Sequence, residues 1–224
     1  MIDLDYRDIE PDSLLYRHMM KFMTASLDRI EPRNYHRIYS QYLPAWKKST
    51  FHMIEIGMYK GTSWHCWGRY FQKADITGVE VKAEFMPRYK SFYRNNPNFK
   101  NRMHMKICNS TDREAVRESF PLDKWKDKCQ FIIDDGSHFA SHQIATWHNF
   151  KHYLAPGGIY FIEDINELHE GADDIWEMLE REEKNGWAIK RWKHFMDYEG
   201  LTTTNKERGR GPVPEWMVVL EKPL

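Results

Sequence analysis

Two short apolar segments of the sequence each end in carboxylates. Residues 131–133 lead into the sequence Asp-Asp-Gly-Ser-His, and residues 159–162 lead into the pair Glu-Asp. In open parallel sheets, ligands bind in the crevice beyond the carboxyl ends of the strands. If both segments are strands, their polar ends should therefore converge on one site. The side chains expected there are Asp134, Asp135, His138, Glu163 and Asp164.

A second candidate site follows the apolar segment that ends near residue 56. The sequence Glu55-Ile-Gly57-Met-Tyr-Lys-Gly61-Thr-Ser63 sits between a predicted strand and a predicted helix, where glycines let the backbone approach a ligand. It matches neither the G-x-G-x-x-G fingerprint nor a P-loop. The carboxylate of Glu55 favours a ligand with a cationic group over a phosphate. The alternative is an ordinary strand-to-helix turn with a solvated Glu55.

Two further positions suit a nucleoside. Glu80 ends the next predicted strand, where an acid can accept hydrogen bonds from ribose hydroxyls, although a surface glutamate is an equal interpretation. After the third strand, Asn109 and Ser110 offer small polar side chains that could hold an adenine edge. Ser110 or Thr111 could instead cap the helix that follows, which is the more common role of such residues.

From about residue 50 onward, short apolar runs alternate with helical stretches, which predicts strand-helix units and a mostly parallel sheet. The predicted strands are 51–56, 75–81, 103–107, 129–134, 158–162, 187–192 and 216–220. The predicted helices are 12–30, 35–42, 62–71, 84–95, 112–119, 138–154 and 172–184. The polar stretch 197–214 is long for a loop in a compact domain, so we predict a hairpin tip or lid. We expect an N-terminal helical segment over 1–45 and one domain over 46–224.

Composition narrows the class of protein. The chain has 224 residues, of which 41% are hydrophobic, enough for one globular core. Its 33 basic and 33 acidic residues cancel, so neither nucleic acid nor a membrane surface is an expected partner. The three cysteines form no C-x-x-C pair, and no apolar run approaches the roughly 20 residues of a membrane span. We expect a soluble, cytoplasmic protein, with homo-oligomerisation through the N-terminal segment left open.

Taken together, these motifs resemble the class I S-adenosylmethionine-dependent methyltransferases. More narrowly, Asp-Asp-Gly-Ser-His at 134–138, Pro-Gly-Gly at 156–158 and Glu-Asp at 163–164 resemble the metal-dependent sugar O-methyltransferases of macrolide biosynthesis, with the cephalosporin hydroxylase-like group as a neighbour. The resemblance covers about residues 35–192. It implies an α/β Rossmann-like fold with a mostly parallel seven-stranded sheet, an antiparallel last strand and N-terminal helices.

The resemblance also assigns roles, position by position. His138 matches the general base, and Asp135, Glu163 and Asp164 match ligands of a divalent metal ion. The positions that match contacts to S-adenosylmethionine are Glu55, Gly57, Gly61, Ser63, Glu80, Asn109, Ser110 and Asp134. Three carboxylates without a thiolate favour Mg²⁺, Mn²⁺ or Ca²⁺. The implied reaction is methyl transfer to a hydroxyl of a sugar or small molecule, with His138 removing the hydroxyl proton.

Other functions are compatible with parts of the pattern. A non-haem iron oxygenase would use Asp135, His138 and His142 as its ligands. A cofactor-binding fold that has lost its catalytic activity and serves in assembly is another alternative, and the intact acids and histidine speak against it: Asp135, His138, Glu163 and Asp164. A nucleic-acid methyltransferase is disfavoured by the zero net charge and by the lack of an Asn-Pro-Pro-Tyr-type motif. Binding of S-adenosylmethionine rather than 2-oxoglutarate would distinguish the O-methyltransferase from the iron oxygenase.

Overall fold

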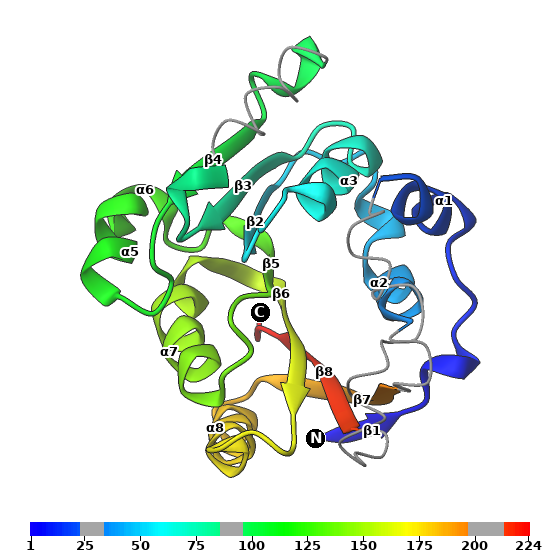
Figure 1. Ribbon diagram of the computed structural model, residues 1–224, viewed down its shortest axis with the longest axis vertical. Coiled ribbons are helices and arrows are strands. Elements are labelled where there is room, and N and C mark those ends of the chain that lie inside the picture. Colours follow the sequence, from blue (N-terminus) through cyan, green and yellow to red (C-terminus); the bar gives the residue numbers. More distant parts are fainter. Residues whose placement is uncertain (23–33, 86–95, 197–212) are drawn as a thin grey trace.

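A computed structural model describes residues 1–22, 34–85, 96–196 and 213–224 of the chain. They form one eight-stranded sheet with the order β1-β7-β8-β6-β5-β2-β3-β4 (Figure 1). The strands are β1 Ile2–Leu4, β2 His52–Ile56, β3 Asp75–Glu80, β4 Met103–Ile107, β5 Cys129–Asp134, β6 Leu154–Asn166, β7 Ala188–Met196 and β8 Val213–Glu221.

The directions of the strands confirm the predicted α/β fold. Strands β2 to β6 run parallel to one another, and β8 is antiparallel to both β6 and β7. The predicted number of seven strands is wrong by one, because Ile2–Leu4 pairs in parallel with Lys190–Trp192 at the edge of the sheet. This strand has only three residues, all exposed, which is too short for an alternating pattern to reveal it in the sequence. The backbone groups of the β7 edge provide the pairing.

The helices agree with most of the predicted positions. They are α1 Ser13–Phe22, α2 Tyr35–Tyr42, α3 Thr62–Tyr70, α5 Arg113–Ser119, α6 Leu122–Trp125, α7 Ala140–Phe150 and α8 Ala172–Lys184. Short 3-10 turns cover Tyr6–Asp8, Pro44–Trp46, Ala83–Phe85, Pro97–Phe99 and Lys151–Tyr153. The predicted helix 138–154 is too long at both ends. Helix α7 begins only at Ala140, after His138 with its positive φ angle, and it ends at Phe150, where the 3-10 turn Lys151–Tyr153 leads into β6. The N-cap of α5 is Asp112, which accepts from the amides of Glu114 and Ala115, rather than Ser110 or Thr111.

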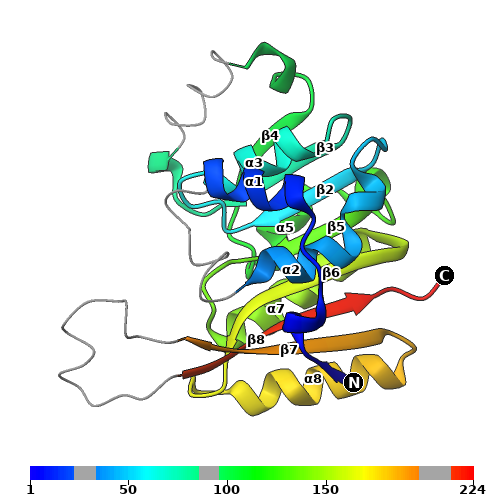
Figure 2. The same ribbon diagram turned by 90° about the vertical axis from the view of Figure 1, so that its right-hand side faces the viewer.

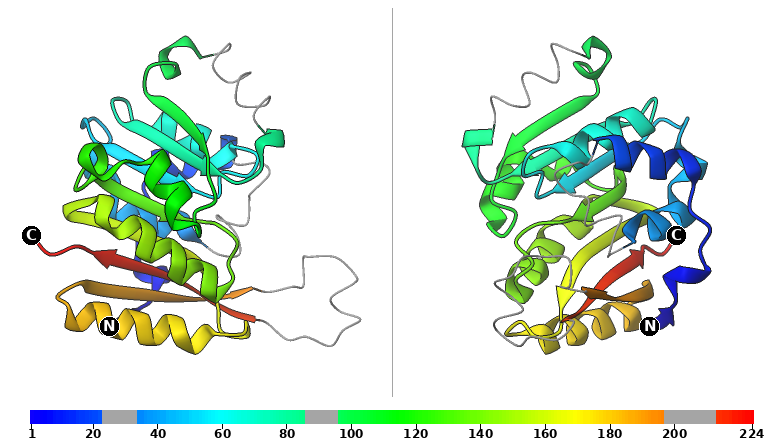
Figure 3. Two further views of the ribbon diagram at one scale, coloured as in Figure 1. Left: turned by 90° about the vertical axis from the view of Figure 1, so that its left-hand side faces the viewer. Right: turned by 45° about the vertical axis from the view of Figure 1, so that its right-hand side comes forward.

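Helices cover both faces of the sheet. Figure 2 shows α1 and α2 in front of the strands, and the left view of Figure 3 shows α7 and α8 in front from the opposite side. The buried residues accordingly form two clusters. Met53 and Phe131 belong to the cluster with α1, α2 and α3, whereas Ile54 and Ile132 belong to the cluster with α7 and α8. Successive side chains of a strand therefore enter different layers, as the pleat of a sheet requires.

Three predictions fall partly on residues outside the described ranges. These are the second half of helix 12–30, most of helix 84–95, and the stretch 197–212 within the predicted hairpin tip or lid. The strands on either side of that stretch pair in antiparallel register from Met196 with Val213 onward. Across the described part of the chain, every helix is too short or too polar to cross a lipid bilayer.

Candidate active site

A cavity of about 770 Å³ lies at the carboxyl ends of the parallel strands, where the sequence placed the site. It is lined by the turn after β2, the end of β3, the segment after β4, the segment after β5 and the acidic pair of β6. The candidate residues that line it are Gly57, Glu80, Asn109, Ser110, Asp135, His138, His142, Glu163 and Asp164. Residues from strands far apart in the sequence are thus brought to one cavity.

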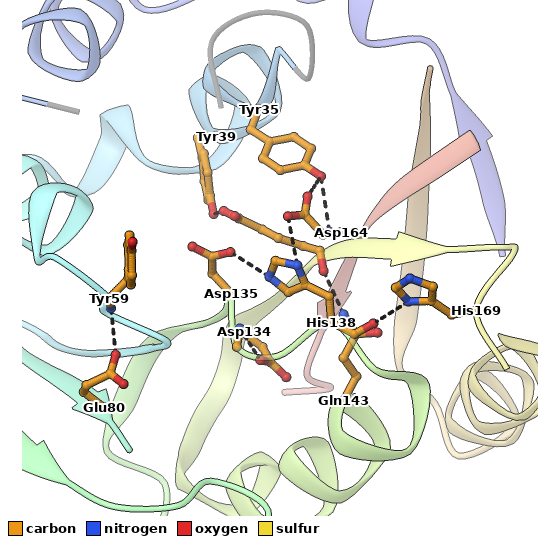
Figure 4. Close-up of polar contacts among 12 residues, drawn as sticks. Tyr35, Tyr39, Tyr59, Glu80, Asp134, Asp135, His138, Gln143, Asp164 and His169 are labelled. Carbon is orange, nitrogen blue, oxygen red and sulfur yellow. Dashed lines mark hydrogen bonds and ion pairs between the residues drawn. The ribbon is translucent and has the colours of Figure 1, made fainter. Parts of the chain in front are cut away.

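One end of the cavity holds an acidic group centred on His138. The Nε2 atom of His138 lies 3.1 Å from Asp135 Oδ1, and its Nδ1 atom lies 3.4 Å from Asp164 Oδ2 (Figure 4). One ligand atom from each of these three residues lies within 4.8 Å of the other two. Ionised carboxylates only accept hydrogen bonds, so this geometry suits a hydrogen-bond donor or an added cation between them. Asp164 is 3% exposed, whereas the cavity side of the group remains accessible.

The backbone of this acidic group is held in an uncommon conformation. His138 and Asp164 have φ angles of 60° and 57°, in the left-handed region that few non-glycine residues adopt. Hydrogen bonds support both positions. The carbonyl oxygen of His138 accepts from His169 Nδ1 at 3.1 Å, and the amide of Asp164 donates to the Tyr35 hydroxyl at 3.2 Å. Strained backbone of this kind persists where the surrounding structure fixes it, which is typical of functional sites.

Two tyrosines of α2 complete the acidic end, and the sequence analysis missed both. The hydroxyl of Tyr35 donates to Asp164 Oδ1, and the hydroxyl of Tyr39 donates to Glu163 Oε1. The only sequence signal is their spacing of four residues, which places both rings on one face of a helix. Glu163 lines the cavity beside the three-residue group but is not a member of it.

Gly57 has a structural requirement that involves the acidic end. Its φ angle is 84°, and a Cβ atom built on it would lie 1.9 Å from the carbonyl oxygen of Asp135. The amide of Asp135 also donates to the carbonyl oxygen of Ile56 at 3.0 Å. The first turn and the segment after β5 therefore touch backbone to backbone. A glycine is needed here to place Asp135, whatever ligand the turn itself approaches.

The other end of the cavity has polar groups suited to a nucleoside. Glu80 accepts from the amide of Tyr59 at 2.7 Å and from that of Lys82 at 3.0 Å, which fixes its carboxylate at the strand end. Asn109 Oδ1 accepts from the amide of Thr111, and Ser110 Oγ lies 3.0 Å from Thr146 Oγ1. The ring of Tyr59, 49% exposed, meets Phe85 edge to face at 5.2 Å. An aromatic surface thus flanks the fixed acid.

Four predicted contact residues lie behind the cavity lining. Glu55 is fully buried and accepts from Trp67 Nε1 at 3.2 Å, because it faces the layer of α3. Gly61 precedes α3 with a φ angle of 73°, and Ser63 is buried within that helix. Asp134 points into the opposite layer, where burial raises the pKa of its carboxyl to about 7. Strand alternation explains why Asp135 reaches the cavity and its neighbour Asp134 does not.

His142 lines the cavity without joining the acidic group. Its Nδ1 atom lies 2.7 Å from Ser137 Oγ, and the third member of the group around His138 is Asp164. The ligand set expected for an iron oxygenase, Asp135 with His138 and His142, is thus not the one that the described residues bring together. The observed set has two carboxylates and one histidine.

Comparison with known proteins identifies the family. The chain belongs to a family of methyltransferase domains, whose model matches residues 54–165. It is 26% identical over 155 residues to the 8-demethyl-8-alpha-L-rhamnosyl tetracenomycin-C 2'-O-methyltransferase of Streptomyces olivaceus, covering 62% of this chain and 36% of that protein. It is also 26% identical over 138 residues to the L-olivosyl-oleandolide 3-O-methyltransferase of Streptomyces antibioticus, covering 56% and 31%. The match therefore spans about a third of each relative.

Solved structures support the fold. The mycinamycin-pathway methyltransferase MycE, solved in complex with Mg, S-adenosylhomocysteine (SAH) and mycinamycin VI, superposes with a TM-score of 0.53 and 20% identity, over 67% of this chain and 38% of that one. An rRNA methylase from Streptococcus thermophilus superposes with a TM-score of 0.57 and 10% identity, over 84% and 96%. Both confirm the Rossmann-like methyltransferase architecture of the described sheet.

Proposed function

We propose that this protein is an S-adenosylmethionine-dependent O-methyltransferase, assisted by a divalent metal ion, that acts on a hydroxyl of a sugar or another small molecule. The observation that carries the proposal is the cavity itself, with Glu80 at one end and the group of Asp135, His138 and Asp164 at the other. The family match and the names of the two sugar O-methyltransferases support it.

Direct contacts to the cofactor are proposed for the candidates that line the cavity. Glu80, held by two backbone amides, would accept from the ribose hydroxyls. Asn109 and Ser110 would meet the adenine edge, and Gly57 would allow the backbone to approach. The remaining candidates lie behind the lining, so we propose that they hold the surrounding turns and strand ends: Glu55, Gly61, Ser63 and Asp134.

The acidic end fits a hard divalent cation. Asp135 and Asp164 supply oxygen donors within 4.8 Å of each other, with Glu163 beside them in the lining, and this donor set suits Mg²⁺, Mn²⁺ or Ca²⁺. These three residues are the proposed ligands. The ion, when bound, would supply positive charge that makes an acceptor hydroxyl more acidic.

His138 is the proposed general base. Histidine, with an ordinary pKa of about 6.5, accepts protons near neutral pH. The side chain of His138 is 32% exposed toward the cavity, so an acceptor hydroxyl can reach it. The carboxylate of Asp164 faces Nδ1, where it would orient the ring and stabilise the imidazolium that forms when Nε2 takes the hydroxyl proton. The acceptor hydroxyl would take the place of Asp135 beside Nε2.

A cofactor and metal assay tests this function. The purified protein is expected to bind S-adenosylhomocysteine, and to transfer a labelled methyl group to a hydroxylated acceptor only when Mg²⁺ or Mn²⁺ is present. Removal of the metal with EDTA should stop transfer, and added Mg²⁺ should restore it. Binding of 2-oxoglutarate in place of S-adenosylhomocysteine would contradict the proposal in favour of an oxygenase. Cofactor binding without transfer to any of a panel of sugars and phenols would favour a non-catalytic fold.

A further inference from the structure

Helix α2 reaches across the fold to the two adjacent acids of β6. The hydroxyl of Tyr35 donates to Asp164, 129 residues away in sequence (Figure 4). The hydroxyl of Tyr39 donates to Glu163, 124 residues away. Both tyrosines and Glu163 are 0% exposed, and Asp164 is 3% exposed. Buried hydroxyls and carboxylates that meet directly, rather than through solvent, hold each other in one orientation.

Each tyrosine ring is fixed by its surroundings. Tyr39 packs edge to face on Trp67 at 5.2 Å and against Phe161 at 4.9 Å between ring centroids. The hydroxyl of Tyr35 makes two hydrogen bonds with the same residue. It donates to Asp164 Oδ1 and accepts from the backbone amide of Asp164. The helix therefore presents two hydroxyls at set positions, one for each acid.

These hydrogen bonds decide which oxygen of Asp164 faces the cavity. Tyr35 engages Oδ1, and the other oxygen, Oδ2, lies 3.4 Å from Nδ1 of His138. The bond from the amide of Asp164 to the same hydroxyl also supports the left-handed backbone at that residue, with its φ angle of 57°. A single phenol thus sets both the backbone and the carboxylate plane of a proposed metal ligand.

We propose that Tyr35 and Tyr39 are positioning residues of the metal centre, and that the docking of α2 is coupled to metal binding. The inference rests on the proposed function of the acidic group as a metal site. Hydrogen bonds behind metal ligands orient them, and their loss costs about 10- to 100-fold in metal affinity. The N-terminal segment of the chain is then part of the active centre rather than an appendage to it.

A competing interpretation is that the two hydroxyls only stabilise the packing of α2. Under that interpretation, their removal lowers the melting temperature but leaves the affinity of the folded protein for metal unchanged. The chain offers a matched control in Tyr42, on the same helix. The Tyr42 ring contacts Phe161 edge to face at 5.6 Å, while its buried hydroxyl makes no hydrogen bond within the described residues.

The experiment measures Mn²⁺ affinity by electron paramagnetic resonance on the full chain, alongside the melting temperature. Tyr35→Phe and Tyr39→Phe should each weaken Mn²⁺ binding by about tenfold or more. Tyr42→Phe should leave it unchanged. Equal affinity in wild type and both variants would overturn the inference, even if the variants melt at a lower temperature.

Hydrogen exchange provides a second readout, which begins with the wild-type protein. Mn²⁺ should slow the exchange of the amides in 35–42 of the wild-type protein, and this protection should be reduced in Tyr35→Phe. Metal binding without any protection of α2 would contradict the coupling. If the wild type binds no Mn²⁺, or if Asp135→Asn leaves Mn²⁺ binding intact, the proposed metal site itself fails. That outcome is distinct from failure of the tyrosine positions alone.

Discussion

Two places in the fold that hold carboxylates differ in their surroundings. At the cavity, Asp135 and Asp164 face an imidazole, and Asp164 and Glu163 accept hydrogen bonds from phenols. On the other side of the sheet, Glu182 of α8 accepts from Lys151 Nζ at 2.6 Å and from Trp147 Nε1 at 3.0 Å. The first group adjoins a cavity, whereas the second is packed against α7.

The hydrogen-bond partners distinguish a structural acid, Glu182, from acids that could take part in binding or catalysis. The ammonium group of Lys151 forms an ion pair with Glu182, so the chain itself supplies the partner of this acid. Burial alone would raise the pKa of Glu182, but the bonds from Lys151 and Trp147 outweigh burial and lower it. At the cavity, the described ion pairs of Asp135 and Asp164 involve His138, whose imidazole has a neutral form that can accept a proton. Such a group can exchange its cationic partner for a metal ion or a proton from a substrate.

The largest expected effect comes from His138. His138→Ala should lower kcat for methyl transfer by about 10²- to 10⁴-fold, the usual contribution of a general base. Affinity for S-adenosylhomocysteine should stay near the wild-type value, because the cofactor end of the cavity is untouched. Steady-state kinetics and calorimetry would measure the two quantities. Unchanged kcat would mean that the acids around His138 are structural, as Glu182 is.

The next effect concerns stability at the other acid. Lys151→Met leaves Glu182 buried without its ammonium partner and should cost about 3 kcal/mol in the free energy of unfolding. Urea denaturation would measure the loss, with Lys124→Met, at an exposed position of α6, as the matched control. The folded fraction of the Lys151→Met variant should still bind S-adenosylhomocysteine. A loss of cofactor affinity would mean that Glu182 is coupled to the cavity, and would contradict a purely structural role for this acid.

Low pH should remove the difference in stability between wild type and Lys151→Met. The folded-state pKa of Glu182 is lowered from its ordinary value of 4.5, so its stabilising contribution is complete above pH 4.5 and is lost as pH falls through the folded pKa. The stability gap between wild type and Lys151→Met should therefore be largest near neutral pH and shrink progressively below pH 4.5. Unfolding curves at a series of pH values would test the sign. A gap that widens in acid would contradict the assignment.

The last prediction compares alanine substitutions at two glycines that have similar backbone conformations. Gly57 and Gly171 have φ angles of 84° and 79°, so alanine at either site should cost about 1–2 kcal/mol in backbone strain. At Gly171, before α8, the nearest atom to a new Cβ is Asp174 Oδ2 at 3.3 Å, which can move. At Gly57 it is the backbone of Asp135 at 1.9 Å, which cannot move without displacing the acid.

Gly57→Ala should therefore lose methyl transfer and Mn²⁺ affinity as well as stability, whereas Gly171→Ala should lose stability alone. Thermal unfolding and metal titration on the two variants would distinguish these outcomes. Equal losses of metal affinity in both variants would show that backbone strain, and not the contact with Asp135, governs the site.

The sequence by itself determined the elements and the strand ends that carry polar residues. Strands β4 and β5 and helices α2 and α8 lie where the apolar periodicity predicted them, because that periodicity is set by the geometry of each element. The polar ends of β3 and β5 were likewise readable, whereas β6 continues to Asn166 past its acidic pair, and only its parallel pairing with β5 ends at Ile162. The convergence of Asp135 and Asp164 followed from the rule that parallel strands end at one edge.

Only the tertiary structure decided which of the neighbouring polar residues face the cavity. Asp134 and Asp135 are alike in sequence, yet one enters the layer of α7 and α8 and the other lines the site. Glu55 faces Trp67 rather than the cavity for the same reason. Facing depends on the register of the whole strand within the sheet, because alternate side chains point to opposite sides, and register is a property of pairing between distant segments.

The contacts across the fold were also beyond the sequence. The tyrosines of α2 reach acids more than a hundred residues away, and the edge strand β1 pairs with β7 near the other end of the chain. Neither contact leaves a local pattern in the sequence. A tyrosine in a helix has the same sequence context whether or not its hydroxyl finds a partner, and the same holds for three exposed residues that pair as a strand. Periodicity fixes an element's own shape, whereas its partners are selected by the packing of the complete chain.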